Sequence, residues 1–290
     1  MPKVRLDVLL TERGLAESRA KAQALIMAGQ VRVDGQTALK AGAQIADDST
    51  LEVDSGPRFV SRGGEKLDGA LEAFQLDVKD FVCADVGAST GGFTDCLLQR
   101  GAAKVYAIDV GKGILHWKLR NDPRVVVMEE TNARYVESLP ERVDLVTIDA
   151  SFISLKVLLP VVKHWIANPA SYRQAREERE ENLNPGDLSE LRGSKKNGGE
   201  IIALIKPQFE AGKKDVARGD GVIRDPEIHK HVLLDVLSFA QNDGFGIRGL
   251  VKSPLLGPKG NAEFLAWMDQ ASSPERSELL NLVEKIFISS

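Results

Sequence analysis

One stretch restricts the fold of this chain more than any other. Residues 83–94 read Cys-Ala-Asp-Val-Gly-Ala-Ser-Thr-Gly-Gly-Phe-Thr. The apolar start is typical of a buried strand, and the glycines let the backbone approach a ligand without a Cβ atom in the way. A helix that begins near Gly91 or Gly92 offers free N–H groups at its first turn. The pattern predicts strand, loop and helix, with these candidate cofactor contacts: Asp85, Gly87, Ser89, Gly91 and Gly92.

A second strand follows at the right distance for a βαβ unit. Residues 104–109 are β-rich and end at Asp109, 24 residues after Asp85. An acid at this strand end binds ribose hydroxyls in doubly wound sheets. The loop lacks the dinucleotide spacing Gly-x-Gly-x-x-Gly, and no Lys-Ser or Lys-Thr pair follows it as in a P-loop. We therefore expect adenosine without a phosphate chain, as in S-adenosylmethionine. The alternative is a tight strand-to-helix turn without a ligand.

The remainder of the large domain repeats this alternation. Strands are expected near 81–86, 104–109, 124–128, 143–149, 200–206 and 246–252, with helical segments between them. This order predicts an α/β fold, a doubly wound Rossmann-like, mainly parallel sheet with helices on both faces. Residues 168–199 break the pattern and are expected to be an exposed insertion. Residues 273–287 are expected to form a terminal helix with Ser273 as N-cap and Pro274 at the first position.

The first 55 residues form a separate small α+β module. Leucines at helical spacing end at Gly14, and Ser18 can cap a second helix that ends at Gly29. A short strand then turns at Asp34-Gly35, which is a hairpin signal. Residues 56–65, rich in glycine, are the expected linker, and 66–290 the large domain. That domain opens with an amphipathic helix over 66–74.

Composition limits the class of protein. The chain has 290 residues, 43% hydrophobic and 28% charged, without a signal-type segment or an apolar run long enough to span a bilayer. We therefore expect a cytoplasmic location. The two cysteines and four histidines show no ligand spacing, so no metal site is expected. The net charge of −4 argues against bulk attraction to nucleic acid, so any RNA binding is local.

The N-terminal module resembles a known RNA-binding domain. Arg5-Leu6-Asp7, residues 18–22 and residues 29–35 together are similar to the domain first described in ribosomal small-subunit protein S4. Residues 1–35 hold six cations against four anions. The candidate phosphate contacts are Arg5, Arg19, Lys21 and Arg32, with Arg62 of the linker in addition. The alternative is that they are ordinary solvated charges.

Polar residues stand at three further strand ends of the large domain. The apolar run 143–149 stops at Asp149, which would project into the cofactor crevice or cap a turn. The run 201–205 ends at Lys206, and a cation there indicates that its ammonium reaches a cleft. Asn132 follows the strand near 124–128. It is a candidate for the adenine edge, although asparagine is also a common turn former.

Four segments together resemble the TlyA family: residues 61–67, 85–92, 149–155 and 206–210. The resemblance covers nearly the whole chain. It implies an S4-type module joined to an FtsJ-like methyltransferase that uses S-adenosylmethionine. It also implies 2′-O-methylation of cytidine ribose, with ribosomal RNA or ribosomal subunits as partners. The family's catalytic Lys-Asp-Lys-Glu set corresponds to Lys66, Asp149, Lys206 and Glu263, the last in the irregular segment 253–263.

The chemistry of such a set can be stated independently. A ribose hydroxyl is a poor nucleophile, so a base must take its proton during in-line attack on the sulfonium methyl. Burial and a neighbouring cation depress the pKa of a lysine ammonium. We therefore expect Lys206 to be the base and Lys66 to assist it and stabilise the developing alkoxide. Asp149 and Glu263 would orient the lysines and the ribose, and no metal is required.

Three other functions compete with this one. The enzyme could methylate a small molecule or a protein, with the N-terminal module serving only in assembly. The chain could bind RNA with an inactive methyltransferase fold, although the glycine loop, Asp149 and Lys206 are all present. Related proteins have been labelled haemolysins, which implies action on membranes. The absence of a spanning segment or a long basic amphipathic helix argues against lysis.

Overall fold

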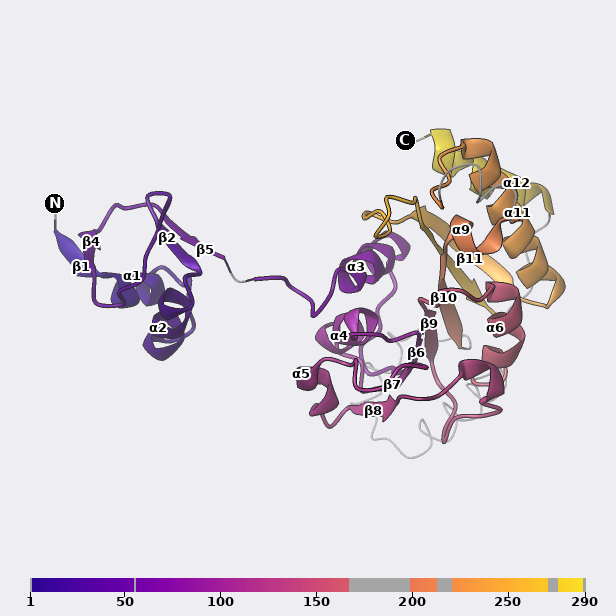
Figure 1. The fold of residues 1–290 in the computed structure, drawn as a ribbon, viewed down its shortest axis with the longest axis horizontal. Coiled ribbons are helices and arrows are strands. Elements are labelled where there is room, and N and C mark those ends of the chain that lie inside the picture. Colours follow the sequence, from indigo (N-terminus) through magenta and orange to yellow (C-terminus); the bar gives the residue numbers. More distant parts are fainter. Residues whose placement is uncertain (1, 55, 167–198, 213–220, 271–275, 289–290) are drawn as a thin grey trace, which may run out of the picture. The chain divides into compact units, whose positions relative to one another are not determined.

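The computed structural model describes residues 2–54, 56–166, 199–212, 221–270 and 276–288. The chain forms two compact units, Met1–Arg58 and Phe59–Ser290 (Figure 1). The boundary thus falls inside the expected linker, and Phe59 is already buried in the core of the second unit. The expected insertion at 168–199 lies outside the described residues except for Gly199. Ser273 and Pro274, the expected helix start, also lie outside them.

The first unit packs two helices against two small sheets. Helices α1 (Leu6–Glu12) and α2 (Arg19–Met27) surround a core that includes Leu6, Leu10, Ile26 and Val31. Strands β1 (Lys3–Arg5) and β4 (Gln44–Ala46) pair antiparallel, and β2 (Val31–Val33) lies between β3 (Gln36–Thr37) and β5 (Leu51–Val53). The predicted cap and hairpin are confirmed. Ser18 accepts a hydrogen bond from Lys21 N, and Asp34 and Gly35 turn with φ of 50° and 80°.

The second unit is built on a seven-stranded sheet in the order β11-β12-β10-β9-β6-β7-β8. The strands are β6 (Val82–Val86), β7 (Lys104–Ile108), β8 (Val125–Met128), β9 (Leu145–Ile148), β10 (Glu200–Ile205), β11 (Gly246–Lys252) and β12 (Phe264–Asp269). The strands from β10 to β8 are parallel, and the chain winds outward from β6 in both directions. The predicted α/β, doubly wound fold is confirmed.

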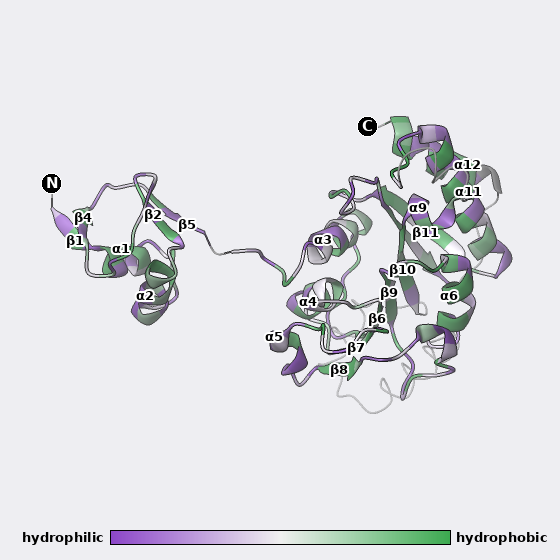
Figure 2. Ribbon diagram, viewed as in Figure 1, coloured by the Kyte–Doolittle hydropathy of each residue, from purple (hydrophilic) through white to green (hydrophobic). Residues whose placement is uncertain are grey.

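Helices cover both faces of this sheet (Figure 1). One core joins α3 (Gly63–Phe74) and α4 (Gly92–Gln99) to the sheet, and the other core joins α6 (Leu155–Val162), α11 (Pro226–Asn242) and α12 (Arg276–Ile288). In β10, Ile202 and Leu204 belong to the first core, whereas Ile201 and Ile205 belong to the second. This alternation follows from the two-residue period of a strand, and burial of both faces accounts for the mainly apolar central strands, green in Figure 2.

Strand β12 was not among the expected strands. Its sequence, Phe-Leu-Ala-Trp-Met-Asp, is a continuous apolar run from which periodicity alone cannot distinguish strand from helix. It runs antiparallel to both neighbours and pairs Phe264 with Ile205 at the carboxyl end of β10. The reversal matters for the site, because it places Glu263 at the edge where the parallel strands end.

Two further properties of the described part of the chain bear on function. None of its helices has the length and apolar character that a bilayer crossing requires. It also contains no group of three or more His, Cys, Asp and Glu side chains that could hold a metal ion.

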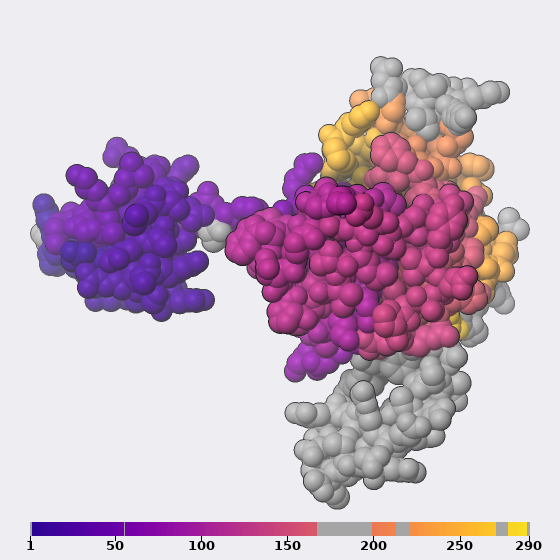
Figure 3. Space-filling model, turned by 60° about the horizontal axis from the view of Figure 1, so that its bottom comes forward, coloured from indigo at the N-terminus to yellow at the C-terminus, as the bar shows by residue number. Residues whose placement is uncertain are grey.

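Cys83 and Cys96 are buried free thiols. Residues from β7 to α6, magenta to pink in Figure 3, form a broad surface of the second unit.

Candidate active site

The glycine loop between β6 and α4 has the geometry of a ligand cradle. Gly87 follows the strand with φ of 83°, and a Cβ atom there would lie 2.6 Å from the carbonyl oxygen of Asp149. Glycine is therefore required where the loop passes the end of β9. Gly91 is the N-cap residue of α4, with φ of 98°, and Gly92 begins the helix.

Asp109 fixes this loop to the next strand. Its Oδ2 accepts a hydrogen bond of 2.8 Å from Ser89 N, and its Oδ1 accepts one of 2.7 Å from Gly111 N. The carboxylate is half-buried just after β7. Each oxygen has further capacity to accept a hydrogen bond. Asp109 is thus held rigidly beside the loop with acceptors available to a ligand hydroxyl.

Asp85, by contrast, lies beneath the loop. It is fully buried and accepts hydrogen bonds from the hydroxyls of Thr94 (2.7 Å) and Thr147 (3.1 Å). Burial raises the pKa of this carboxyl to about 7, against the opposing effect of the two threonines. The structure gives Asp85 contacts that join β6, α4 and β9, and its side chain does not line the cleft described next.

A cleft of about 210 Å³ opens at the carboxyl edge of the sheet, next to the loop. It is bounded by the start of α3, the glycine loop, the end of β9 and Pro258. The residues from the sequence-predicted set that line it are Arg62, Lys66, Gly87, Ser89, Gly92 and Asp149. Four segments far apart in the sequence therefore contribute to one cleft.

Lys206 meets Asp149 at the adjacent ends of β10 and β9. The distance from Lys206 Nζ to Asp149 Oδ1 is 2.5 Å, and Nζ also donates a hydrogen bond of 3.0 Å to Ser151 Oγ. The Lys206 side chain is only 9% exposed and that of Asp149 is 23% exposed. Parallel pairing of the two strands explains this proximity, because it brings both strand ends to the same edge.

Lys66 forms the second ion pair, with Glu263. The Nζ to Oε2 distance is 2.6 Å, and the side chains are 10% and 1% exposed. Lys66 lies in the first turn of α3, and Glu263 immediately precedes β12. The segment 253–263 closes around the carboxylate, where a Cβ atom at Gly257 would lie 2.5 Å from Glu263 Oε1. The absence of a side chain at Gly257 makes room for the acid.

The four predicted catalytic side chains thus form two ion pairs, Lys66 with Glu263 and Lys206 with Asp149. Lys66 and Asp149 both line the cleft, and each holds its partner, Glu263 or Lys206, by an ion pair. Each ammonium faces a carboxylate. This differs from the expectation that Lys66 would be the charged neighbour of Lys206, since the charged contact of Lys206 is Asp149.

Sequence reasoning missed the contacts that clamp residues 149–155 to residues 206–210. Ser151 accepts from Lys206, Phe152 packs on Phe209 with ring centroids 5.0 Å apart, and Glu210 accepts hydrogen bonds from Ser154 Oγ and Leu155 N. Phe152 has φ of 64° and its side chain is 90% exposed. An exposed phenylalanine beside Lys206 is a candidate contact for substrate, and its sequence carried no signal of exposure.

After β8, Glu129 makes more contacts with the neighbouring loop than the predicted Asn132 does. Asn132 is exposed, and its Oδ1 accepts a hydrogen bond from Arg134 N at the start of the 3₁₀ helix η1 (Ala133–Tyr135). Glu129 accepts from the backbone of Gly113, Ile114 and Leu115 and from Arg120. The Arg120 hydrogen bond, followed by those from the backbone, lowers the pKa of Glu129 to about 2. The one sequence feature that could have singled out Glu129 is its position as an acid just after β8.

In the first unit, two of the candidate RNA contacts converge. Arg5 and Arg19 both donate to Asp7, which is fully buried and also accepts from Gln23. These hydrogen bonds, of which the one from Arg5 has the largest effect, hold the pKa of Asp7 well below its usual range. The side chains of Arg5 and Arg19 stay 42% and 54% exposed. Lys21 on α2 and Arg32 on β2 are exposed, while Arg62 belongs to the second unit.

Comparison with known proteins agrees with this architecture. Residues 59–270 match the model of the FtsJ-like methyltransferases, and residues 4–48 match that of the S4 domain. The 16S/23S rRNA (cytidine-2′-O)-methyltransferase TlyA of Mycobacterium tuberculosis is 45% identical over 270 residues, which cover 92% of this chain and 90% of that protein. The chain belongs to the TlyA family.

Two other TlyA relatives extend over nearly the whole length. Hemolysin A of Brachyspira hyodysenteriae is 38% identical, covering 91% of this chain and 98% of that protein. A solved structure from Streptococcus thermophilus, named as a hemolysin, is 39% identical with a TM-score of 0.66, covering 99% and 97%. The family predicted from the four motifs is therefore confirmed, as is a methyltransferase fold preceded by an S4 domain. The chain is an enzyme of the methyltransferase class.

Proposed function

We propose that this enzyme methylates the 2′-hydroxyl of a cytidine ribose in ribosomal RNA, with S-adenosylmethionine as cofactor and Lys206 as general base. One observation carries the proposal: Lys206 pairs with Asp149 at the strand ends beside the glycine loop, and Asp149 lines the same cleft as Lys66. The substrate named for the Mycobacterium tuberculosis relative supports the choice of ribose chemistry. Ribosomal RNA as substrate puts the activity in the cytoplasm.

The residues present fit this cofactor. The loop 87–91 contains no lysine or arginine, which suits a ligand without a phosphate chain, and its glycine at 87 allows close backbone approach. Asp109 supplies acceptors for two ribose hydroxyls, and Gly87, Ser89 and Gly91 would hold the methionine part. When bound, S-adenosylmethionine supplies a methyl group activated by its sulfonium charge.

The chain's own residues then handle the proton and the position of the hydroxyl. A lysine acts as a base only in its neutral form, so Lys206 must first release a proton from the ammonium that faces Asp149. Lys206 Nζ accepts the proton of the 2′-hydroxyl as its oxygen attacks in line. Lys66 stabilises the developing negative charge on that oxygen. Asp149 orients Lys206, and Glu263 orients Lys66.

The surroundings of the cleft favour RNA over a small molecule. Phe152 offers an exposed ring that packs on Phe209, whose own ring centroid is 5.8 Å from Lys206 Nζ, and aromatic side chains are platforms on which unpaired bases stack. Arg62 adds an exposed cation at the cleft. In the first unit, the arginine pair on Asp7 keeps exposed guanidinium groups, which can donate to phosphate oxygens.

The proposal is tested by supplying S-adenosylmethionine with a labelled methyl group. The acceptors are unmethylated ribosomal subunits, free ribosomal RNA and bulk protein, and any labelled nucleotide is then mapped. We expect label in a 2′-O-methyl cytidine of ribosomal RNA, and the mapping identifies the subunit. Label confined to protein or small molecules, or no label despite cofactor binding, contradicts the proposal. Leakage from liposomes incubated with the same protein tests the haemolysin alternative.

A further inference from the structure

A second hollow lies near the cleft and has no part in the reaction described above. It has a volume of about 360 Å³, within the range of ligand pockets. We call it the Arg224 hollow. The residues that define it are Arg224, His229, Lys252, Leu256, Phe264 and Phe287.

The segment 253–263 separates the Arg224 hollow from the catalytic cleft. Pro258 of this segment lines the cleft, whereas Leu256, Gly260 and Ala262 line the hollow. Ala262 is the immediate neighbour of Glu263, which pairs with Lys66. Lys252 ends β11 at the edge where the parallel strands end. A ligand in the hollow and a substrate in the cleft would therefore contact the same short segment.

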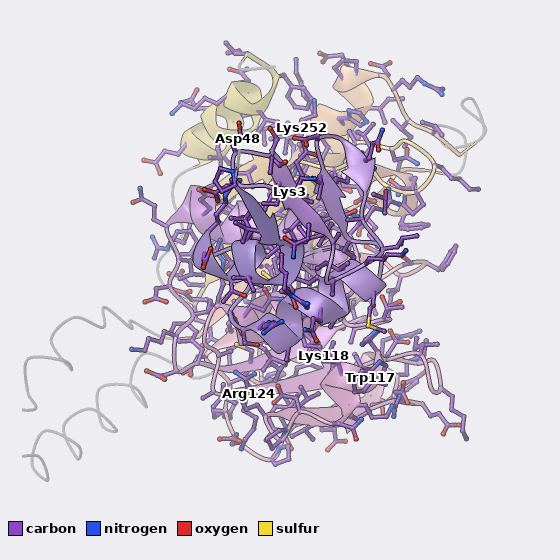
Figure 4. All side chains as sticks on the ribbon, turned by 90° about the vertical axis from the view of Figure 1, so that its left-hand side faces the viewer. Lys3, Asp48, Trp117, Lys118, Arg124 and Lys252 are labelled. Carbon is purple, nitrogen blue, oxygen red and sulfur yellow. The ribbon has the colours of Figure 1, made fainter. Side chains whose placement is uncertain are left out.

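The charged groups of the hollow are positive. Arg224 and Lys252 are exposed, and neither has an ion pair within the part of the chain that the structure describes. The two acids nearest in sequence are engaged: Asp225 accepts from Glu227 N as the cap of α11, and Glu227 pairs with Lys230. In Figure 4, Lys252 lies at the opposite end of the second unit from Trp117, Lys118 and Arg124.

The rest of the lining is apolar and aromatic. Leu256 is 54% exposed, and the ring of Phe287 is half-buried. His229 is buried between Phe264 and Phe287, with ring centroids 5.6 and 6.5 Å away. Burial lowers the pKa of His229, so this ring is neutral at neutral pH and acts as part of the aromatic lining. The hollow thus combines cations with surfaces suited to a planar ring.

Hydrogen bonds hold the hollow in this shape. Asn261 Oδ1 accepts from Ile223 N at 2.9 Å, and Asn261 Nδ2 donates to the carbonyl of Gly221. The ring Nε2 of His229 lies 3.0 Å from the carbonyl oxygen of Ile223. The segment 221–223, which precedes Arg224, is therefore tied both to the segment 253–263 and to α11. A site fixed in advance binds at a lower ordering cost.

We propose that the Arg224 hollow binds one nucleotide, with its phosphate on Arg224 and Lys252 and its base against Leu256 and Phe287. In the reaction, this nucleotide is a neighbour in the RNA chain of the one methylated, an assignment that rests on the proposed function. Holding it would fix the register of the strand, so that a single ribose reaches Lys206. Contacts to phosphate set the position of a nucleic acid along the protein, and stacking of an unpaired base on an aromatic side chain adds affinity.

The test compares the full-length protein with the double variant Arg224→Gln, Lys252→Gln. A matched control, Lys79→Gln with Arg142→Gln, removes two exposed cations from residues that precede β6 and β9, at the opposite edge of the sheet. Binding of a labelled single-stranded RNA octamer is measured at several salt concentrations. Loss of both cations from this one phosphate should weaken binding roughly tenfold at low salt and lower the slope of log affinity against log salt by about 0.7.

The control should bind like the unaltered protein, and both variants should keep their thermal stability. Equal octamer binding by both double variants overturns RNA as the source of the nucleotide. A parallel titration with cytidine and adenosine 5′-monophosphates tests a free nucleotide as the source. Binding of these compounds that is lost with Arg224 and Lys252 supports the nucleotide site, even where octamer binding is unchanged. The proposal is overturned if neither probe distinguishes the variants, or if inorganic phosphate competes as well as the nucleotides.

These binding measurements do not require turnover. Failure of methyl transfer to RNA would contradict the proposed function and its flanking-nucleotide assignment, while a nucleotide site would still be detected. Retained methyl transfer with unaltered binding by the double variant would contradict only the Arg224 hollow. The two failures are therefore distinguishable.

Discussion

Lys66 and Glu263 stand 197 positions apart in the chain, yet their Nζ and Oε2 atoms are 2.6 Å apart in a buried ion pair. The pair connects the first turn of α3 to the residue before β12. Removal of one member leaves a buried charge without its partner. The contact therefore links the integrity of the fold to the proposed chemistry.

We predict that Lys66→Met destabilises the protein by about 3–5 kcal/mol, because it leaves the Glu263 carboxylate buried without its partner. Lys66→Met combined with Glu263→Leu should recover much of this loss, since an apolar pair replaces the ion pair. Neither variant should transfer methyl groups at the normal rate. Urea unfolding and methyl transfer measure the two effects separately. A single variant as stable as the unaltered protein would show that the pair carries little energy.

Asp109→Ala should weaken S-adenosylmethionine binding at least tenfold. The substitution removes the proposed ribose acceptor and also the partner of the Ser89 and Gly111 amides. Asp77→Ala is the matched control, because Asp77 likewise accepts a backbone hydrogen bond, from Lys79 N, but precedes β6 at the other edge of the sheet. Calorimetric titration with the cofactor gives both affinities. Equal affinity in the two variants would remove Asp109 from the cofactor site.

Asp85 makes stability depend on pH. Its folded pKa of about 7 exceeds the ordinary value of 3.8, so the folded protein binds the extra proton between these limits. Stability therefore falls as pH rises from about 4 to about 7, by an amount on the order of 4 kcal/mol. Asp85→Asn mimics the protonated form and should be more stable than the unaltered protein at pH 8, with little gain at pH 4. Urea unfolding at both pH values tests this. A pH-independent difference would contradict it.

The arginine pair of the first unit should affect RNA binding more than turnover. We expect Arg5→Gln with Arg19→Gln to raise KM for RNA several-fold, because two exposed guanidinium groups are lost, while kcat is retained. Arg13→Gln is the charge control, since Arg13 donates to the carbonyls of Asp47 and Ser49 in the same unit. A fall in kcat with unchanged KM would assign the pair a different role. Thermal unfolding checks that the S4 domain stays folded without these partners of Asp7.

The parts of this structure that could be predicted from sequence have short-range signals. Strand β6, its glycine loop and β7 follow from residues close together in the chain. Asp149 and Lys206 could be placed at one edge because parallel strands end together. The contact between Lys66 and Glu263 could not be derived in this way. It depends on the reversed direction of β12, and an uninterrupted apolar run does not encode that direction.

Three further differences have local physical causes. Asp85 lies two residues from the loop within β6, so its side chain points to Thr94 of α4 and Thr147 of β9. Asn132 caps η1, a use of asparagine that competes with ligand binding at any strand end. Phe152 has a positive φ and an exposed ring, which composition would place in a core. Tertiary contacts decide each of these outcomes.

The most direct test of the account is single-turnover methyl transfer to ribosomal RNA by Lys206→Ala, with cofactor binding measured on the same sample. Lys156→Ala is the control, because Lys156 lies on α6 and pairs with Asp235 away from the cleft. We predict that Lys206→Ala loses at least about 100-fold in rate, the contribution of a positioned general base, while its cofactor affinity stays nearly unchanged. A retained rate, or a loss of cofactor binding as large as the loss of rate, would contradict the role of Lys206 as the base.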